Sequence, residues 1–226
     1  MRTLLLVSHT HWDREWYLTF QQFRLKLVHL IDGLLDLLDA DPEYKYFMLD
    51  GQTIVLDDYL AIRPERRPDL WRHVQSGRLL IGPWHILPDE FLVSPEATIR
   101  NLLEGDRTAR RFGPKMMIGY LPDSFGHIGQ MPQILRGFGI QTAAFRRGLS
   151  DEPCELWWEG PDGSRLLTFY AAGGYGSGLL PPPDWPYRTW LALIHSGDNQ
   201  GPPQPDAVET LLKQAEKELP GVNVRM

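Results

Sequence analysis

The segment HTHWDREWY places residue types that bind metal ions beside residue types that bind sugars. His11 lies two residues after His9, and Asp13 lies two residues after His11. Side chains two residues apart in an extended chain point to the same side, so His11 can share one cation with Asp13 or with His9. Imidazole and carboxylate ligands suit Zn²⁺, although other divalent metals accept them too. The alternative is a histidine at a sheet edge that only hydrogen-bonds to backbone.

Two further polar segments also follow predicted strands. They are GPWHILPDE, residues 82–90, and LPDSFGH, residues 121–127. Ligands of parallel α/β sheets bind outside the carboxyl ends of the strands, so we expect all three segments to meet at one rim. Asp123 would then join His11 and Asp13 as a third metal ligand.

Tryptophans accompany these segments at Trp12, Trp16 and Trp84. An aromatic face beside carboxylates suits a sugar, because the apolar face of the sugar ring stacks while its hydroxyls need polar partners. The alternative is that these rings only cover the end of a barrel. We take Trp16 and Trp84 as candidate substrate-binding residues.

The remaining candidates have simpler interpretations. His85 has two equal interpretations, a residue of the site or a histidine at the sheet edge. His127 either orients Asp123 or caps a helix, and the helix cap is favoured. We expect His29, His73 and His195 to be structural or solvated, Trp157 and Trp158 to fill the core, and Cys154 to be inert.

Short apolar runs alternate with amphipathic segments along the first 150 residues. We predict strands at 4–7, 46–49, 79–81, 116–121 and 142–145, and helices at 20–38, 52–62, 68–75, 94–112 and 131–138. Ser94 is the expected N-cap of its helix, with proline at the first helical position. This alternation predicts an α/β fold with a mostly parallel sheet and right-handed crossovers.

The alternation changes after Ser150. Residues 155–158 and 165–170, joined around GPDG, predict a hairpin or a pair of edge strands. A glycine-rich stretch at 173–178 and a proline-rich stretch at 181–186 predict a surface excursion. We expect helices near 190–194 and from 206 to 219, followed by the start of another buried strand in PGVNVRM.

The bulk composition excludes some classes of partner. The 226 residues are 42% hydrophobic and 23% charged, and the net charge of -6 comes with scattered basic residues, which argues against a nucleic-acid partner. One cysteine excludes an internal disulfide and indicates a reducing compartment. The apolar run at the N-terminus is too short for a signal peptide, and no stretch is long enough to span a bilayer. We expect a cytoplasmic protein.

The motifs HTHWDREWY, GPWHILPDEFLVSPE, LPDSFGHIGQMPQIL and WWEGPDGSRLL resemble the N-terminal catalytic domain of glycoside hydrolase family 38, the α-mannosidases, especially bacterial members. The resemblance covers almost the whole chain in the same order. It implies one domain over residues 1–226, forming an irregular (β/α) barrel that is incomplete at the C-terminus. Some metal-dependent polysaccharide deacetylases share this fold.

The resemblance also implies the roles of particular residues. His11 and Asp13 match two zinc ligands, and Asp123 matches the aspartate that is both a ligand and the nucleophile of a retaining mechanism. Trp16 matches the tryptophan under the sugar ring. Arg147 matches an arginine near the nucleophile, with Arg146 as the rival position. The implied substrate is an α-mannoside or a small mannose-containing oligosaccharide.

The family's acid/base aspartate and its fourth zinc ligand match no residue before Met226. We therefore expect little hydrolysis of natural mannosides by this chain alone, because losing a general acid costs on the order of 10²–10⁴ in rate. An incomplete barrel would also expose apolar edges, which favours association of copies. The competing hypotheses are a carbohydrate deacetylase that uses His9 and His11 as ligands, and a sugar-binding half-domain without catalysis.

Overall fold

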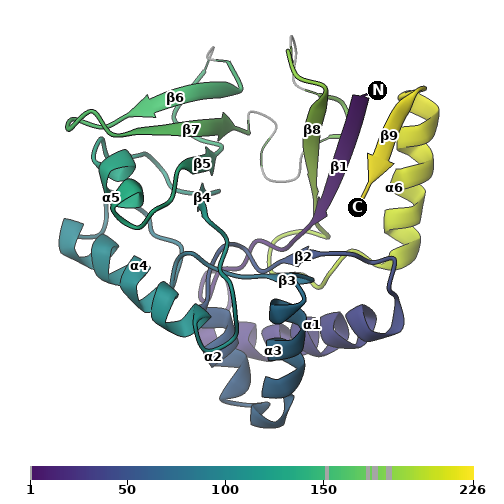
Figure 1. Ribbon diagram of the computed structural model, residues 1–226. Coiled ribbons are helices and arrows are strands. Elements are labelled where there is room, and N and C mark those ends of the chain that lie inside the picture. The colour runs from purple at the N-terminus through teal and green to yellow at the C-terminus, as the bar shows by residue number, and fades with distance from the viewer. Residues whose placement is uncertain (1, 151–152, 172–173, 175–177, 182–184) are drawn as a thin grey trace. The chain divides into compact units, whose positions relative to one another are not determined.

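The computed structural model describes residues 2–150, 153–171, 174, 178–181 and 185–226 (Figure 1). The chain divides into two compact units. Unit 1 consists of Met1–Asp50, Val55–Leu80 and Gly176–Met226, and unit 2 consists of Gly51–Ile54 and Ile81–Tyr175. The prediction of one catalytic domain over residues 1–226 stays a prediction.

Unit 1 is built on parallel strands. Strands β1 (Arg2–Ser8), β8 (Thr189–Ile194) and β9 (Val222–Arg225) form one sheet in the order β8-β1-β9. Strands β2 (Phe47–Met48) and β3 (Leu79–Leu80) form a second parallel pair. A parallel bridge between His9 and Met48 joins the end of β1 to β2. The chain that leaves β1 therefore runs beside the chain that leaves β2.

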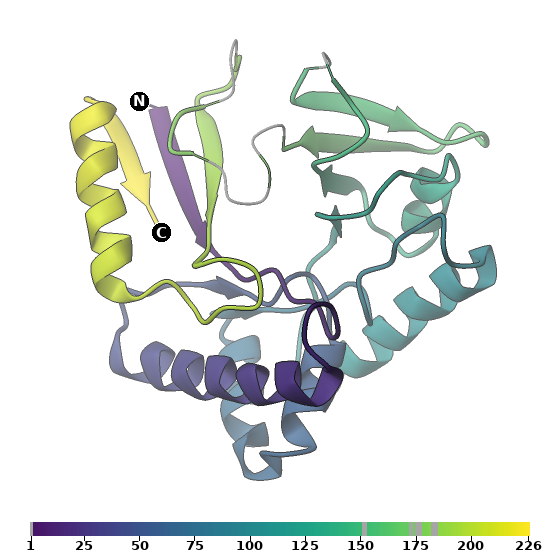
Figure 2. The same ribbon diagram turned by 180° about the vertical axis from the view of Figure 1, so that it is seen from behind.

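The helices of unit 1 lie where the sequence predicts helices, apart from a short 3₁₀ helix that buries no residue. They are α1 (Phe20–Ala40), α2 (Ile54–Leu60), the 3₁₀ helix η1 (Pro64–Arg66), α3 (Arg67–Gln75) and α6 (Pro205–Glu218). Helix α1 starts at a capping box of Thr19 and Gln22 and buries one face along its full length. Helix α6 runs alongside β9 in both views (Figures 1 and 2).

Unit 2 contains a four-stranded sheet in the order β4-β5-β7-β6. Its strands are β4 (Ile118–Leu121), β5 (Thr142–Phe145), β6 (Glu155–Glu159) and β7 (Arg165–Tyr170), and only β6 runs antiparallel to its neighbour. Helices α4 (Pro95–Ala109) and α5 (Met131–Gly137) belong to this unit. Ser94 caps α4 as predicted, since its hydroxyl accepts a hydrogen bond from the Ala97 N–H.

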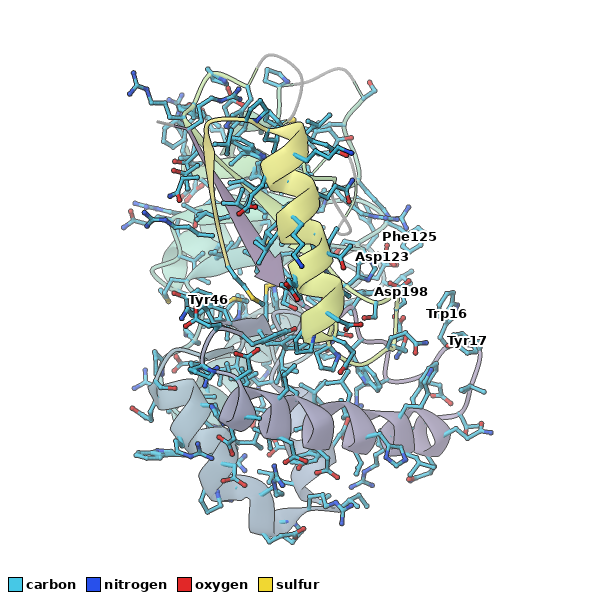
Figure 3. The ribbon with its side chains drawn as sticks, turned by 90° about the vertical axis from the view of Figure 1, so that its right-hand side faces the viewer. Trp16, Tyr17, Tyr46, Asp123, Phe125 and Asp198 are labelled. Carbon is cyan, nitrogen blue, oxygen red and sulfur yellow. The ribbon has the colours of Figure 1, made fainter. Side chains whose placement is uncertain are left out.

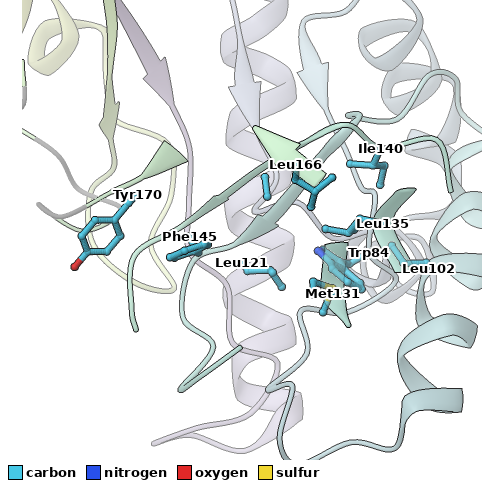
Figure 4. Packing of buried hydrophobic residues seen from close by; sticks show 10 residues of the cluster. Trp84, Leu102, Leu121, Met131, Leu135, Ile140, Phe145, Leu166 and Tyr170 are labelled. Atoms are coloured by element: carbon cyan, nitrogen blue, oxygen red, sulfur yellow. The ribbon is translucent and has the colours of Figure 1, made fainter. Parts of the chain in front are cut away.

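The core of unit 2 is one cluster of buried apolar side chains from the loop around Trp84, the helices and the sheet (Figure 4). Its members are Trp84, Leu102, Leu121, Met131, Leu135, Ile140, Ala143, Phe145, Leu166 and Tyr170. The cluster fixes the start of the segment 121–127, because Leu121 is buried in it two residues before Asp123.

Two predictions about elements are wrong. Residues 189–194 form the parallel strand β8 beside β1, not a helix. A short apolar run fits a buried strand or a buried helix equally well by periodicity, and here pairing with β1 decides. Trp157 does not fill the core, since it is 64% exposed on β6, whereas Trp158 packs against the core cluster.

The other predicted strands and helices are present, although β9 is half-buried where a buried strand was expected. The mixed α/β class with mostly parallel strands therefore stands, and the irregular barrel stays a prediction. The glycine-rich and proline-rich stretches lie largely outside the described residues. Within the described residues, no helix is both long and apolar enough to cross a membrane.

Candidate functional site

The segment after β1 places His11 and Asp13 together in unit 1. The His11 Nε2 atom lies 3.6 Å from the Asp13 Oδ1 atom. The His11 side chain is nearly buried, whereas about a third of the Asp13 side chain is exposed. The prediction that these two side chains point to the same place is confirmed. An imidazole nitrogen and a carboxylate oxygen that converge in this way can ligate one cation.

Asp50 contacts this pair and was missed by the sequence analysis. Its carboxylate lies 3.1 Å from the His11 Nδ1 atom and accepts a 2.7 Å hydrogen bond from the Trp12 N–H. Asp50 follows β2, so the strand-end rule that selected Asp123 applies to it too. No histidine or second acidic residue lies next to Asp50 in the sequence, so nothing else there indicated a site residue.

The charges around His11 favour a positive group at this position. Burial acts to lower the pKa of His11, but the negative charges of Asp50 and Asp13 and the hydrogen bond to Asp50 raise it to about 11. Burial raises the pKa of Asp50. Two carboxylates around one buried imidazole therefore attract a cation, either the proton of the metal-free protein or a metal ion that takes its place.

His9 and His195 lie next to each other. Their rings stack with centroids 5.1 Å apart, and the His9 Nδ1 atom lies 3.0 Å from the Thr10 carbonyl oxygen. His195 follows the carboxyl end of β8, because the segment before it is a strand and not the expected helix. The stack puts His195 at the same strand-end edge as the His11 segment.

The three tryptophans have different environments. Trp16 is 65% exposed and lies beside Tyr17 in the loop before α1, with ring centroids 5.0 Å apart (Figure 3). Trp12 is buried and packs edge-on against Phe23. Trp84 is 0% exposed, and its Nε1 atom donates to the Tyr120 carbonyl oxygen in the core of unit 2. The prediction that Trp84 binds substrate is therefore wrong, while Trp16 has the exposed face that stacking on a sugar requires.

Asp123 follows β4 in unit 2, where two arginines contact its carboxylate. The Asp123 Oδ1 atom accepts hydrogen bonds from Arg147 Nη2 at 2.6 Å and Nε at 3.2 Å, and Arg146 Nη2 lies 3.4 Å from the same oxygen. The Arg147 guanidinium also lies over the Phe125 ring at 4.3 Å. Arg147, rather than its rival Arg146, makes the close contact, and 28% of the Asp123 side chain stays exposed.

The loop 88–90 holds the segment that carries Asp123. The Ser124 hydroxyl donates to the Pro88 carbonyl oxygen at 2.8 Å, and the Phe125 N–H donates to Asp89 Oδ1 at 3.3 Å. The segments GPWHILPDE and LPDSFGH therefore meet, as predicted for this pair.

A buried pair extends this contact. The Glu90 carboxylate accepts from the Ile128 N–H at 2.8 Å and lies 2.6 Å from His127 Nδ1, while His127 Nε2 lies 3.1 Å from the Arg147 carbonyl oxygen. His127 does not cap α5, whose N-cap is Gln130. It connects the loop 88–90 to the residue that holds Asp123.

Glu90→Gln is expected to lower the free energy of unfolding by about 1–3 kcal/mol. The side chain of Glu90 is fully buried, and its two oxygens contact the Ile128 N–H and His127 Nδ1. A neutral amide keeps only one acceptor oxygen, so the charge-assisted contact with the histidine is lost. Chemical denaturation measures the change. Glu104→Gln, at an exposed pair with Arg107, is the matched control, and an unfolding midpoint for Glu90→Gln equal to that of the control would contradict the prediction.

The residues of unit 1 suit part of a zinc site. Within the described residues, no group of three or more His, Cys, Asp and Glu side chains forms a metal-binding cluster. His11 and Asp13 nevertheless have the chemistry of two zinc ligands, and Asp50 occupies the other ring nitrogen as carboxylates do behind metal-binding histidines. The imidazole of His11 and the carboxylate of Asp13 therefore fit two of the ligand positions of a Zn²⁺ ion.

Within a mostly parallel α/β fold, unit 1 carries a histidine–aspartate pair and an exposed tryptophan, and unit 2 carries an arginine-held aspartate. Residues of these types are typical of carbohydrate-active enzyme domains. The family model described as "Glycosyl hydrolases family 38 N-terminal domain" matches residues 1–219. The chain belongs to this family.

Individual proteins and structures that resemble the chain have names that fit this family. A protein of Halalkalibacterium halodurans named "Putative mannosylglycerate hydrolase" is 46% identical over 198 residues, which are 81% of this chain and 22% of that protein. The crystal structure of an α-mannosidase from Enterococcus faecalis V583 matches with a TM-score of 0.91 and 35% identity, over 100% of this chain and 28% of that one. An α-mannosidase of Saccharomyces cerevisiae is 27% identical over 91% of this chain and 20% of its own length. The chain thus spans less than a third of each relative.

Proposed function

We propose that this chain carries the nucleophile and part of the zinc site of a retaining α-mannosidase that hydrolyses terminal α-mannosyl linkages. Membership of family 38 and the names of the relatives support the reaction class. The observation that carries the proposal is the Asp123 carboxylate, which is partly exposed and held by Arg147 at 2.6 Å. A fixed and accessible carboxylate is what direct attack on a sugar requires.

The chemistry begins with attack by an Asp123 oxygen on the anomeric carbon. That bond forms while the bond to the leaving oxygen breaks, and the leaving oxygen keeps the electron pair and takes a proton from a general acid, a role that this proposal assigns to no residue of the chain. Water then hydrolyses the glycosyl ester and restores the carboxylate. Arg147 keeps the carboxylate in its attacking orientation, and Trp16 offers a face for the sugar ring.

His11 and Asp13 would hold the zinc ion, and the sequence prediction adds Asp123 as a third ligand. When bound, Zn²⁺ supplies Lewis-acid and template chemistry toward the sugar hydroxyls. The cytoplasmic location and the association of copies also stay predictions.

The relative from Halalkalibacterium halodurans suggests the first natural substrate to test. Its name specifies mannosylglycerate, in which the group bound to mannose is the small molecule glycerate. We propose an α-mannoside with a small leaving group, mannosylglycerate first, as the substrate of the protein that contains this chain.

The test is covalent trapping with a fluorinated α-mannosyl fluoride. Fluoride leaves without a general acid, and the ring fluorine slows breakdown of the intermediate, so the nucleophile becomes labelled. We expect a mass increase of one fluoromannosyl group on the peptide that contains Asp123. A label on another residue, or turnover of the fluoride with no label at all, would contradict the proposal. Acetate release from an acetylated glycan, without any labelling, would instead favour the deacetylase.

A further inference from the structure

Asp50 and Asn199 share an uncommon backbone conformation. Their φ angles are 49° and 54°, and among the described residues every other positive φ belongs to glycine. The left-handed region is unfavourable for L-residues, although Asp and Asn tolerate it better than most. Both side chains are buried, at 0% and 1% exposure. Strained residues of this kind cluster at functional sites, so the contacts of these two need an explanation.

Both residues hold the same three-residue segment, His11–Asp13, from different strands. Asp50 follows β2 and contacts the His11 ring at Nδ1, at 3.1 Å, and the Trp12 N–H, at 2.7 Å. Asn199 follows β8; its backbone N–H donates to the His11 carbonyl oxygen at 2.8 Å, and its Nδ2 atom donates to the Asp13 carbonyl oxygen at 2.7 Å. The ring of His11 and the backbone of the whole segment are therefore fixed by two residues distant in sequence.

We propose that Asp50 and Asn199 are positioning residues that hold His11 and Asp13 in place to bind a divalent cation. This inference rests on the proposed zinc site. Asp50 accepts the proton of Nδ1, which leaves Nε2 as the ligating nitrogen, on the side where Asp13 lies 3.6 Å away. Asn199 fixes the backbone at both ligands, so the pair does not have to be ordered when the metal binds.

The left-handed conformation itself makes these contacts possible. At Asp50 the chain turns sharply after β2, and the carboxylate meets the segment that leaves β1. At Asn199 both the backbone N–H and the side-chain amide reach the same segment. A residue with a bulky or β-branched side chain would not adopt this conformation without additional strain, and alanine would lose the side-chain contacts.

Zinc affinity tests the proposal, measured by competition with a chelating dye in the full chain. Asp50→Asn keeps the shape of the side chain but places its amide N–H₂ against either His11 Nδ1 or the Trp12 N–H. Asn199→Gly accepts the left-handed backbone and removes only the donor to Asp13, so its fold is expected to survive. We expect each variant to weaken zinc binding by roughly 10–100-fold, the range typical for partners behind metal ligands. Asp32→Asn, which removes an acid bonded to Tyr59 in the same unit, should bind zinc like the parent.

The control arms separate the two proposals. His11→Ala should abolish binding; if the parent binds zinc no better than His11→Ala, the zinc site itself is wrong and this inference fails with it. If the parent binds and His11→Ala does not, while Asp50→Asn and Asn199→Gly bind within about twofold of the parent, only the positioning role is overturned. Visible spectra with Co²⁺ give a readout besides affinity, since a displaced ligand changes the band positions and a purely structural role does not.

Discussion

Asp123→Asn is expected to lower the rate of hydrolysis of an activated aryl α-mannoside by at least about 10³-fold, as loss of an attacking group does in other enzymes. The amide has the same shape, and its oxygen can still accept from the Arg147 guanidinium, now at 2.6 Å from Asp123. It cannot form the glycosyl ester, because an amide is a poor nucleophile. The loss should therefore appear in kcat while KM changes little, and steady-state kinetics separates the two.

The matched control for this variant is Asp162→Asn. Asp162 is an exposed aspartate of the same unit, in the turn between β6 and β7, where it bonds to Ser164. We expect this variant to keep the parent's kcat and unfolding midpoint. Equal activity of Asp123→Asn and Asp162→Asn would remove Asp123 from the chemistry, whereas a loss of folding in Asp123→Asn would appear as a lower midpoint.

Gly105→Ala is expected to lower the free energy of unfolding by about 3 kcal/mol or more, at the upper end of what overpacking costs. A Cβ atom at Gly105, in α4, would lie 2.1 Å from the Pro83 carbonyl oxygen, 2.6 Å from the Trp84 carbonyl carbon and 2.7 Å from the His85 nitrogen. These are backbone atoms, so no side chain can turn away. Helix α4 would have to move from the segment that holds Trp84 in the core. Urea denaturation measures the loss.

Gly33→Ala is the control, because the same substitution has the opposite sign there. Gly33 lies on the exposed face of α1, and a Cβ atom would meet nothing within 4 Å. Alanine should stabilise this helix by about 0.5–1 kcal/mol. If both variants change stability by the same amount, then the close approach of α4 to residues 83–85 does not constrain Gly105.

The local elements of this protein follow from its sequence because their signals are local. The apolar run before Ser8, the apolar spacing along α1 and the Ser94-Pro95 helix start each need only neighbouring residues to be read. The candidate ligands His11 and Asp13 were found in the same way, since two residues of extended chain fix their relative direction. The family could be recognised for a related reason, because its motifs are short and contiguous.

The tertiary structure decided what depends on partners distant in sequence. Residues 189–194 form a strand because they pair in parallel with β1. Trp84 can be buried because its N–H donates to the Tyr120 carbonyl oxygen inside the core. Asp50 and Asn199 gained their contacts with the His11 segment because three parallel strands end near it. In the sequence, a single aspartate or asparagine does not show that it will contact the His11 segment, because that contact exists only once separate strands come together.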